Sequence, residues 1–337
     1  MAEFMAAEIH MEATAPPPLS PSPHRRILEG KLRPNDIAAR ISRIDAILPE
    51  LRERLDPCRL CPRQCGAHRL DGKVGECGLD GQLRVAAIAR HGGEEPPISG
   101  SRGAINVFFS GCNLHCLHCQ NWPISQKHVG RIRTTAELAE SILRKWRRGA
   151  HALGWVTPTP QVVSALEAYS LCLLVGLDLP LVHNGGGYES VEIVRLLSGI
   201  VDFWLPDAKT RHAQRGQAIN GVMDYPDRNL EAIGEMVNQA VSGSAKAVIV
   251  RHLLLPDGQE DSQGVLKRLW EQFGDSIHLS LMMQYFPTFR TEGHTTLGRR
   301  LASGEYESMV EYARELGFAK GWIQNYEEED GIPLCCL

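Results

Sequence analysis

The residues that decide the fold run from Ile105 to Trp122 and read INVFFSGCNLHCLHCQNW. The first six form a short, mostly apolar run with β-branched and aromatic side chains, which predicts a buried strand. A loop that contains Cys112, Cys116 and Cys119 follows the strand directly. We therefore expect three thiols at the carboxyl end of one strand.

The alternation of short β-rich runs with amphipathic stretches continues along the rest of the chain. The expected strands are Ile105–Ser110, Leu153–Val156, Pro180–His183, Ile200–Pro206, Ala247–Leu254 and Ser276–Met283. The helical stretches that follow them are Thr135–Arg148, Gln161–Val175, Glu189–Leu197, Arg228–Ala240, Asp261–Phe273 and Glu305–Leu316. Such alternation implies a parallel sheet, and a closed barrel would need eight units. We therefore predict an α/β fold, a partial (β/α)6 TIM-like barrel with its active site beyond the carboxyl ends of the strands.

The N-terminal part of the chain differs in composition from the barrel. The first 25 residues are rich in Ala, Pro and Ser and contain too little apolar material to order themselves. Apolar residues at helical spacing predict a helix over Asn35–Arg54, and a cysteine-rich segment without periodicity follows it. We expect four parts: a flexible tail over 1–25, a helix and cysteine-rich extension over 26–104, the barrel over 105–325 and a C-terminal tail over 326–337.

The overall composition is that of a soluble globular protein, and we expect it in the cytoplasm. The 337 residues include 36 basic and 40 acidic side chains, and a net charge of −4 gives no attraction to nucleic acid or an anionic membrane. The longest apolar run, Leu171–Val182, is too short to span a bilayer. The first ten residues lack the basic flank and apolar core of a secretory signal, so we expect the ten cysteines to remain reduced.

The spacing Cys-x3-Cys-x2-Cys after the first strand is typical of a metal centre. Three thiolates on one loop can ligate three irons of a cuboidal [4Fe–4S] cluster, which leaves the fourth iron open to a substrate or cofactor. A zinc site with His115 or His118 as fourth ligand is the alternative, because structural zinc prefers four closed ligands. The position of the loop, directly after the first strand of a parallel barrel, favours the cluster.

The string from Gly111 to Trp122 resembles the signature of the radical S-adenosylmethionine (radical SAM) enzymes. It is similar in particular to the pyruvate formate-lyase activating-enzyme-like branch, including members with an N-terminal four-cysteine segment, and the similarity covers about residues 55–325. The resemblance implies that S-adenosylmethionine chelates the open iron through its amino and carboxylate groups. An electron from the cluster then cleaves the sulfonium C–S bond, and the resulting 5′-deoxyadenosyl radical abstracts hydrogen from a substrate.

The resemblance also implies that later strand ends hold the cofactor. Arg251, on the fifth strand, matches the family arginine that helps hold the methionyl carboxylate, although a core salt bridge would also explain a buried arginine. Asp207 and Lys209 resemble the family's Asp-x-Lys. The lysine could bind the same carboxylate, and the aspartate a ribose hydroxyl or a cation. The alternative for both is an ordinary polar turn.

Two further strand ends supply candidate contacts. Many relatives carry Gly-Gly-Glu after the second strand to hold the amino group of the cofactor, but this sequence has Thr157-Pro158-Thr159-Pro160. The hydroxyl groups of Thr157 and Thr159, or backbone carbonyls, would have to replace that carboxylate. The third strand leads into Asn184 and three glycines, whose amides either contact a ligand or form a flexible turn. Residues 92–95, Gly-Gly-Glu-Glu, precede the cysteine loop, so we interpret them as a loop only.

A second cysteine group lies upstream, with the spacing Cys58-x2-Cys61-x3-Cys65-x11-Cys77. Four thiolates in a segment without a core are typical of a structural metal site. Zinc is the first expectation, and a fully ligated second [4Fe–4S] cluster is the alternative. Cys335–Cys336, next to the carboxyl terminus, are expected to belong to a frayed end.

Together these features predict an oxidoreductase of the radical SAM type. If it follows the activating enzymes, its target is a glycine in a partner protein, and an electron donor such as flavodoxin or ferredoxin is required. One alternative is modification of a peptide or small molecule by the same radical. A non-enzymatic alternative is an iron–sulfur or zinc scaffold.

Overall fold

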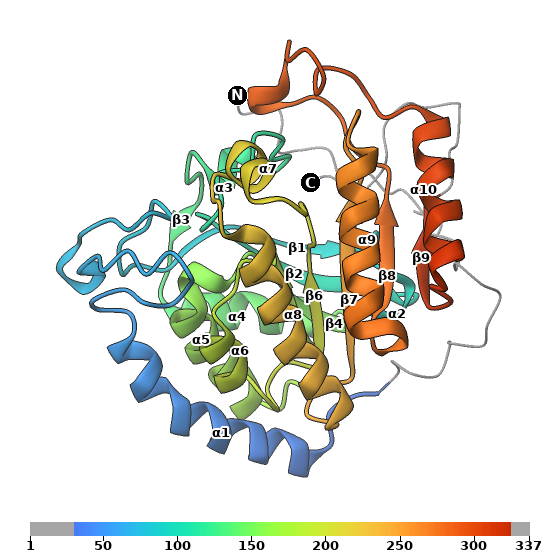
Figure 1. Ribbon diagram of the computed structural model, residues 1–337. Helices are drawn as coiled ribbons and strands as arrows, with labels where there is room; N and C mark the ends of the chain where they lie inside the picture. The colour runs from blue at the N-terminus through green and yellow to red at the C-terminus, as the bar shows by residue number, and fades with distance from the viewer. Residues whose placement is uncertain (1–29, 325–337) are drawn as a thin grey trace.

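The computed structural model describes residues 30–324, and a sheet lies at its centre with helices along its outer face (Figure 1). Its strands are β1 (Arg84–His91), β2 (Ala104–Phe109), β3 (Arg131–Ile132), β4 (Ala152–Val156), β5 (Leu181–Gly185), β6 (Phe203–Pro206), β7 (Ala247–Leu253), β8 (His278–Met282) and β9 (Gly321–Ile323). Their order is β3-β1-β2-β4-β5-β6-β7-β8-β9. Each pair of neighbours in the series β2-β4-β5-β6-β7-β8-β9 is parallel. The strand β1 pairs antiparallel with both β2 and β3. The prediction of a partial parallel barrel is confirmed.

The expected helices are all present between the parallel strands. The α-helices of the described residues are α1 (Pro34–Glu53), α2 (Pro96–Ser99), α3 (Trp122–Ser125), α4 (Thr135–Trp146), α5 (Val162–Leu174), α6 (Val191–Leu196), α7 (Ala213–Arg215), α8 (Tyr225–Val241), α9 (Gln259–Phe273) and α10 (Ser303–Leu316). Sequence signals explain where some of them begin. At α4, the N–H of Glu137 donates to the Thr134 hydroxyl at 3.2 Å, and the Glu137 carboxylate accepts the Thr134 N–H at 2.7 Å. This capping box satisfies two backbone donors that a helix start leaves free.

Side chains alternate along the strands between an outer and an inner core. On β7, Val248 and Val250 pack among the helices, whereas Ile249 packs inside the barrel with Phe203 and its neighbours. Because side chains of a strand alternate with a period of two, Arg251 is the next residue on the inner side. The backbone pattern therefore directs this arginine into the barrel at the carboxyl end of its strand.

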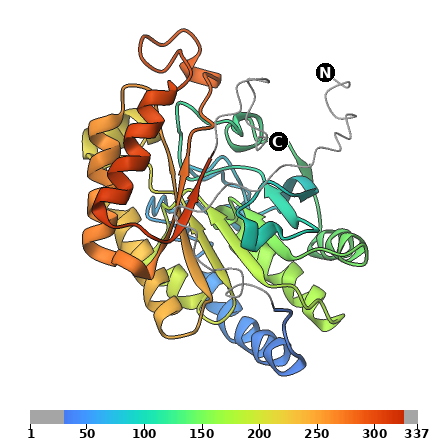
Figure 2. The ribbon, with the colours of Figure 1, turned by 90° about the vertical axis from the view of Figure 1, so that its right-hand side faces the viewer.

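The sheet does not close into a full barrel, and a segment between β1 and β2 packs across its interior (Figure 2). Ile98 of α2 belongs to the inner core together with Trp322 of β9 and Ala247 of β7. The segment before the first parallel strand and the last strand thus meet inside the barrel. Neither β1 nor the three-residue β9 is among the strands that the sequence predicts.

The N-terminal extension lies against the outside of the barrel. The predicted helix over Asn35–Arg54 is confirmed as α1, whose buried Arg40 donates to Asp202 at 2.8 Å. Residues 54–83 contain little regular structure apart from a 3-10 turn at Arg69–Asp71. The predicted tails over 1–25 and 326–337 lie outside the described residues.

The described chain begins and ends on different sides of the barrel. The Leu32 N–H donates to the Asp178 carbonyl at 2.7 Å, just before β5, so the chain begins near the amino ends of the strands. It ends at Gln324, directly after β9, near the carboxyl ends. No helix within residues 30–324 is both long and apolar enough to cross a bilayer.

Candidate functional site

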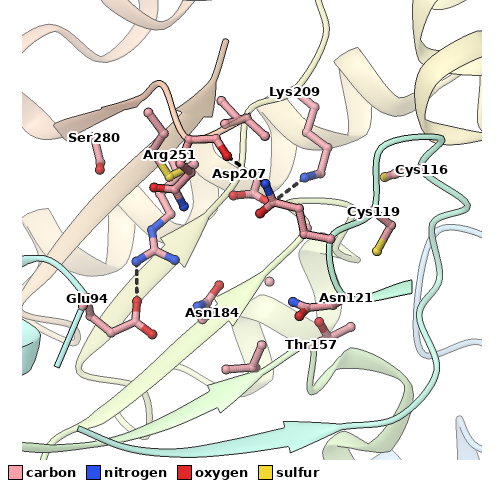
Figure 3. Close-up of a pocket in the computed structure, with 18 of the residues that line it drawn as sticks. Glu94, Cys116, Cys119, Asn121, Thr157, Asn184, Asp207, Lys209, Arg251 and Ser280 are labelled. Atoms are coloured by element: carbon pink, nitrogen blue, oxygen red, sulfur yellow. Dashed lines mark hydrogen bonds and ion pairs between the residues drawn. The ribbon is translucent and has the colours of Figure 1, made fainter. Parts of the chain in front are cut away.

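A pocket opens at the carboxyl ends of the parallel strands, where the fold class predicts the active site (Figure 3). Its walls come from the loop after β2, the turn after β4, the strand β5, the turn after β6 and the strand β7. The structure brings most of the predicted site residues together here. Those that line the pocket are Cys112, Cys116, Cys119, Thr157, Asn184, Asp207, Lys209 and Arg251.

Polar groups surround the three thiols of the loop after β2. The Leu114 N–H donates to the Cys112 sulfur at 3.4 Å, and the Cys116 thiol donates to the Asn220 side-chain oxygen at 3.7 Å. The Cys119 sulfur and the Ser125 hydroxyl lie 3.1 Å apart. All three cysteines are free thiols. The loop therefore presents three sulfurs that already have hydrogen-bonding partners.

Burial keeps these thiols protonated in the absence of a metal. It raises the pKa of Cys116 to about 12, against the opposing positive charge of Lys209. The pKa values of Cys112 and Cys119 are also raised, again mainly by burial. A thiolate needs a positive partner in such surroundings, and metal ligation supplies one because it displaces the thiol proton.

An ion pair between Asp207 and Lys209 lies beside the cysteine loop, with 2.6 Å between the lysine nitrogen and a carboxylate oxygen. Burial lowers the pKa of Lys209, but the charge of the Asp207 carboxylate raises it by more than burial lowers it. The pKa of Lys209 is therefore above its ordinary value. The ammonium is therefore charged and lies close enough to lower the pKa of the thiols. The predicted Asp-x-Lys contributes to the pocket rather than to a solvated turn.

Two histidines of the loop differ in their surroundings. The Nδ1 atom of His115 lies 3.0 Å from the Gln126 side-chain oxygen. His118 lines the pocket, and within residues 30–324 its buried Nδ1 atom has no hydrogen-bond partner. Burial, with the charges of Lys209 and Arg215, lowers the pKa of His118 to about 3 and keeps the ring neutral. His118 thus offers an unpaired ring nitrogen within the site.

Arg251 pairs with two glutamates that precede the cysteine loop. Its Nε donates to Glu95 at 2.8 Å, its Nη2 donates to Glu95 at 2.7 Å, and Nη2 also pairs with Glu94. Figure 3 shows the guanidinium directed at Glu94. The core salt bridge that was the alternative interpretation of Arg251 is therefore present, and contact with the cofactor stays a prediction.

Glu94 and Glu95 line the pocket, although the sequence predicts only a loop at these positions. Residues 92–95 form a loop, as expected, but the loop reaches into the barrel and lines the pocket. The Asn106 side chain of β2 donates to Glu94 at 2.6 Å. Gly154 on β4 leaves room for that asparagine, since a Cβ there would lie 2.1 Å from its side-chain oxygen. An asparagine inside an apolar strand is the signal that could have revealed the buried carboxylate.

Thr159 is the predicted contact that the structure places elsewhere. Its hydroxyl donates to both oxygens of the buried Glu189 side chain, at 2.8 Å and 2.7 Å. Burial raises the pKa of Glu189 to about 7. The two residues stabilise the base of the turn after β4, and only Thr157 of that turn's two threonines lines the pocket.

The four cysteines of the extension do not line the pocket but lie behind its wall. Cys77 and Leu79 contact Gly111, where a Cβ would meet the Cys77 carbonyl oxygen at 2.8 Å. Gly111 has a φ of +78°, so the sharp turn from β2 into the cysteine loop also needs glycine. The extension therefore packs directly against the start of the loop.

Comparison with known proteins identifies relatives in sequence and in fold. No family model matches the chain. The uncharacterized protein MJ0674 of Methanocaldococcus jannaschii is 27% identical over 270 residues, which cover 77% of this chain and 74% of that protein. SuiB of Streptococcus suis bound to precursor peptide SuiA matches with a TM-score of 0.45 at 13% identity, over 64% of this chain and 46% of SuiB, less than half of its length.

A radical SAM methyltransferase from Sphaerobacter thermophilus matches over 70% of each chain, with a TM-score of 0.50 at 12% identity. This likeness shows that the chain shares the fold of that radical SAM enzyme.

Proposed function

We propose that this chain is a radical SAM enzyme, which cleaves S-adenosylmethionine reductively at a [4Fe–4S] cluster. The observation that carries the proposal is the placement of three free thiols, from Cys112, Cys116 and Cys119, on the loop after the first parallel strand, where they line the pocket. Active sites of such folds lie at this end of the strands. The fold shared with a radical SAM methyltransferase supports the same class.

The residues of the pocket fit both groups. Each of the three cysteines would ligate one iron, and the Leu114 N–H donates to the Cys112 sulfur in the way that tunes cluster thiolates. Lys209, held by Asp207, lies close enough to the thiols for its positive charge to favour their deprotonation. When bound, the cluster and S-adenosylmethionine would supply one-electron chemistry that generates a 5′-deoxyadenosyl radical for hydrogen abstraction. Thr157, Asn184 and Arg251 remain our candidates for contact with the cofactor.

The finer part of the proposal concerns the substrate. The resemblance of Gly111–Trp122 to the pyruvate formate-lyase activating-enzyme-like branch supports a glycine in a partner protein as the hydrogen donor. An electron carrier such as flavodoxin or ferredoxin would reduce the cluster. Modification of a peptide or a small molecule is the alternative within the same chemistry, and a zinc or iron–sulfur scaffold is the non-enzymatic alternative.

The experiment that tests the function is a cleavage assay under anaerobic conditions. Reconstituted protein is reduced with dithionite and supplied with S-adenosylmethionine, and 5′-deoxyadenosine is measured. Cys116→Ala removes one iron ligand and should abolish the product. Cys172→Ala is the matched control, because Cys172 is buried in α5 outside both cysteine groups and should leave activity intact.

The outcomes separate the alternatives. Cleavage retained in Cys116→Ala would overturn the ligand assignment. A wild-type protein that holds only a four-coordinate zinc ion at the loop and yields no deoxyadenosine would favour the scaffold. Deuterium transferred into deoxyadenosine from a glycine-labelled protein or peptide would support the glycyl-radical-activating type, and transfer from a small molecule would contradict it.

A further inference from the structure

The four cysteines of the extension lie in a short segment that has little regular structure but folds back on itself. The Cys58 N–H donates to the Ala67 carbonyl and the Gly66 N–H donates to the Cys58 carbonyl, both at 3.0 Å, so the chain folds back and places Cys65 beside Cys58. A Cβ on Gly75 would lie 3.2 Å from the Cys65 sulfur and 3.8 Å from the Cys77 sulfur. All four are free thiols. Four thiols within twenty residues of irregular chain make the ligand set of a thiophilic metal.

A buried arginine beside these thiols needs a negative partner. Arg69 is 2% exposed, and it donates to the Asp80 carbonyl at 3.0 Å and 2.7 Å and to the Pro160 carbonyl at 2.7 Å. Within residues 30–324 no carboxylate forms an ion pair with it. Its Nη1 atom lies 3.8 Å from the Cys58 sulfur. A buried charge is costly unless it is paired, and a metal bound by four thiolates carries net negative charge. Such a centre would therefore compensate Arg69.

The same segment holds the three-cysteine loop through Arg63. This residue lies between two of the four cysteines, and its Nε donates to the Asn113 carbonyl at 2.9 Å. Its Nη2 atom lies 3.3 Å from the Gly221 carbonyl, next to Asn220, whose side chain accepts from the Cys116 thiol. One guanidinium thus connects the extension both to the loop and to the segment over 219–221 that pairs with it. The contact of Cys77 with Gly111 adds a second connection.

We propose that Cys58, Cys61, Cys65 and Cys77 bind a thiophilic metal, as a zinc ion or a second iron–sulfur cluster, and that this centre positions the three-cysteine loop through Arg63. The metal fixes the turns on either side of Arg63, and the guanidinium fixes the Asn113 carbonyl of the loop and the Gly221 carbonyl of the segment that packs against it. The metal site stands independently of the proposed function, whereas the positioning role rests on it.

The metal site is tested in the full chain after the loop cysteines have been removed. The variant Cys112→Ala/Cys116→Ala/Cys119→Ala is purified anaerobically and its metals are counted. About one zinc or about four irons per chain would support the proposal and tell the two forms apart. Addition of Cys58→Ala to this variant should abolish the metal. A triple variant that is folded, as judged by circular dichroism, but holds neither metal would overturn the proposal.

The positioning role is tested with variants that keep all seven cysteines. Arg63→Ala should retain the metal of the extension but weaken the binding of S-adenosylmethionine at least tenfold. It should also alter the electron paramagnetic resonance change that S-adenosylmethionine causes in the reduced loop cluster. Arg63→Lys should restore part of the affinity, because a lysine can still donate to one carbonyl. Arg59→Ala, an exposed arginine of the same segment, is the matched control and should match the wild type.

Three results separate the possible failures. Wild-type affinity and an unchanged spectrum in Arg63→Ala would overturn the positioning role and leave the metal site standing. Loss of the extension's metal in Arg63→Ala would show that Arg63 supports the metal rather than transmits its effect, which also overturns that role. A wild-type protein that does not cleave S-adenosylmethionine would refute the proposed function, while the metal count of the triple variant would still decide the site.

Discussion

Replacement of Arg251 tests whether it is the required counter-charge of two buried carboxylates. Glu94 and Glu95 are 6% and 4% exposed, and both pair with this guanidinium. Arg251→Met keeps an apolar stem but leaves both carboxylates unpaired, and the loss of one partner from a buried ion pair costs about 3–5 kcal/mol. At about 2–4 °C per kcal/mol for a domain approaching this size, Tm should fall by roughly 6–20 °C.

The size of this loss should depend on pH. In the wild type burial raises the pKa of Glu94, but the Arg251 charge outweighs it, so the pKa lies below its ordinary value. The pair therefore contributes stability above the ordinary glutamate pKa of about 4.3, and this contribution is lost as pH falls through the lowered pKa. Arg251→Met removes the main group that opposes burial and leaves only the His91 charge and the Asn106 hydrogen bond against it. The pKa of Glu94 therefore rises in the variant, and protonation in mildly acidic solution relieves the unpaired charge. The deficit of the variant should be larger at pH 8 than at pH 5.

Urea unfolding of the full chain at both pH values measures the effect. Arg268→Met is the matched control, because Arg268 pairs with Asp227 at the surface, where the side chains are 27% and 72% exposed. Exposed pairs of this kind contribute about 0–1 kcal/mol. A broken buried ion pair should cost several times more than this. A loss below about 1 kcal/mol in the free energy of unfolding of Arg251→Met at pH 8 would therefore refute the reasoning. An equal deficit at both pH values would refute it as well.

Three further predictions concern other positions. Gly154→Ala places a Cβ 2.1 Å from the Asn106 side-chain oxygen and should lower the free energy of unfolding by about 1–3 kcal/mol in urea, whereas Gly304→Ala, at an open position of α10, should leave it equal or higher. Burial raises the pKa of Glu189 to about 7, so the wild type should lose stability as pH rises from about 4.3 to 7, and Tm measured against pH should show a smaller loss in Glu189→Gln. Gly111→Ala, where φ is +78° and a Cβ would lie 2.6 Å from the Leu79 side chain, should displace the cysteine loop and reduce its bound iron, and an unchanged iron-to-protein ratio would count against this account.

Hydrophobic periodicity and the spacing of the cysteines were sufficient to predict much of the fold and part of the site. Each predicted parallel strand is an apolar run between turn residues, and such runs can be recognised locally because burial on both faces demands them. The loop of Cys112 was recognised for a similar reason, since all three thiols lie within eight residues. The sequence does not predict the strands β1 and β9, because their patterns are weaker. β9 has three residues, and β1 is half-buried with charged residues at its ends.

The carboxylates of the pocket escaped prediction because their location depends on the tertiary fold. Residues 92–95 precede the first parallel strand, so the order of elements along the chain predicts a position outside the barrel. The structure brings them inside, because Ile98 packs in the inner core and the preceding loop follows it. A local pattern cannot show that Arg251 and Glu95 meet across 156 residues of chain. Thr159 shows the opposite error. It is predicted to line the pocket because it lies in the turn after β4, but its hydroxyl binds Glu189 and supports the turn itself.

The two ends of the described chain bear on how this protein can be attached to a surface or a label. Leu32 binds backbone before β5, whereas Gln324 contributes to the rim of the cavity. Immobilisation through a surface residue beside Leu32 would leave the barrel between the support and the cavity mouth, so that a large protein substrate or redox carrier could approach the mouth. A bulky fusion joined close after Gln324 would instead start at that mouth and compete with either one for access.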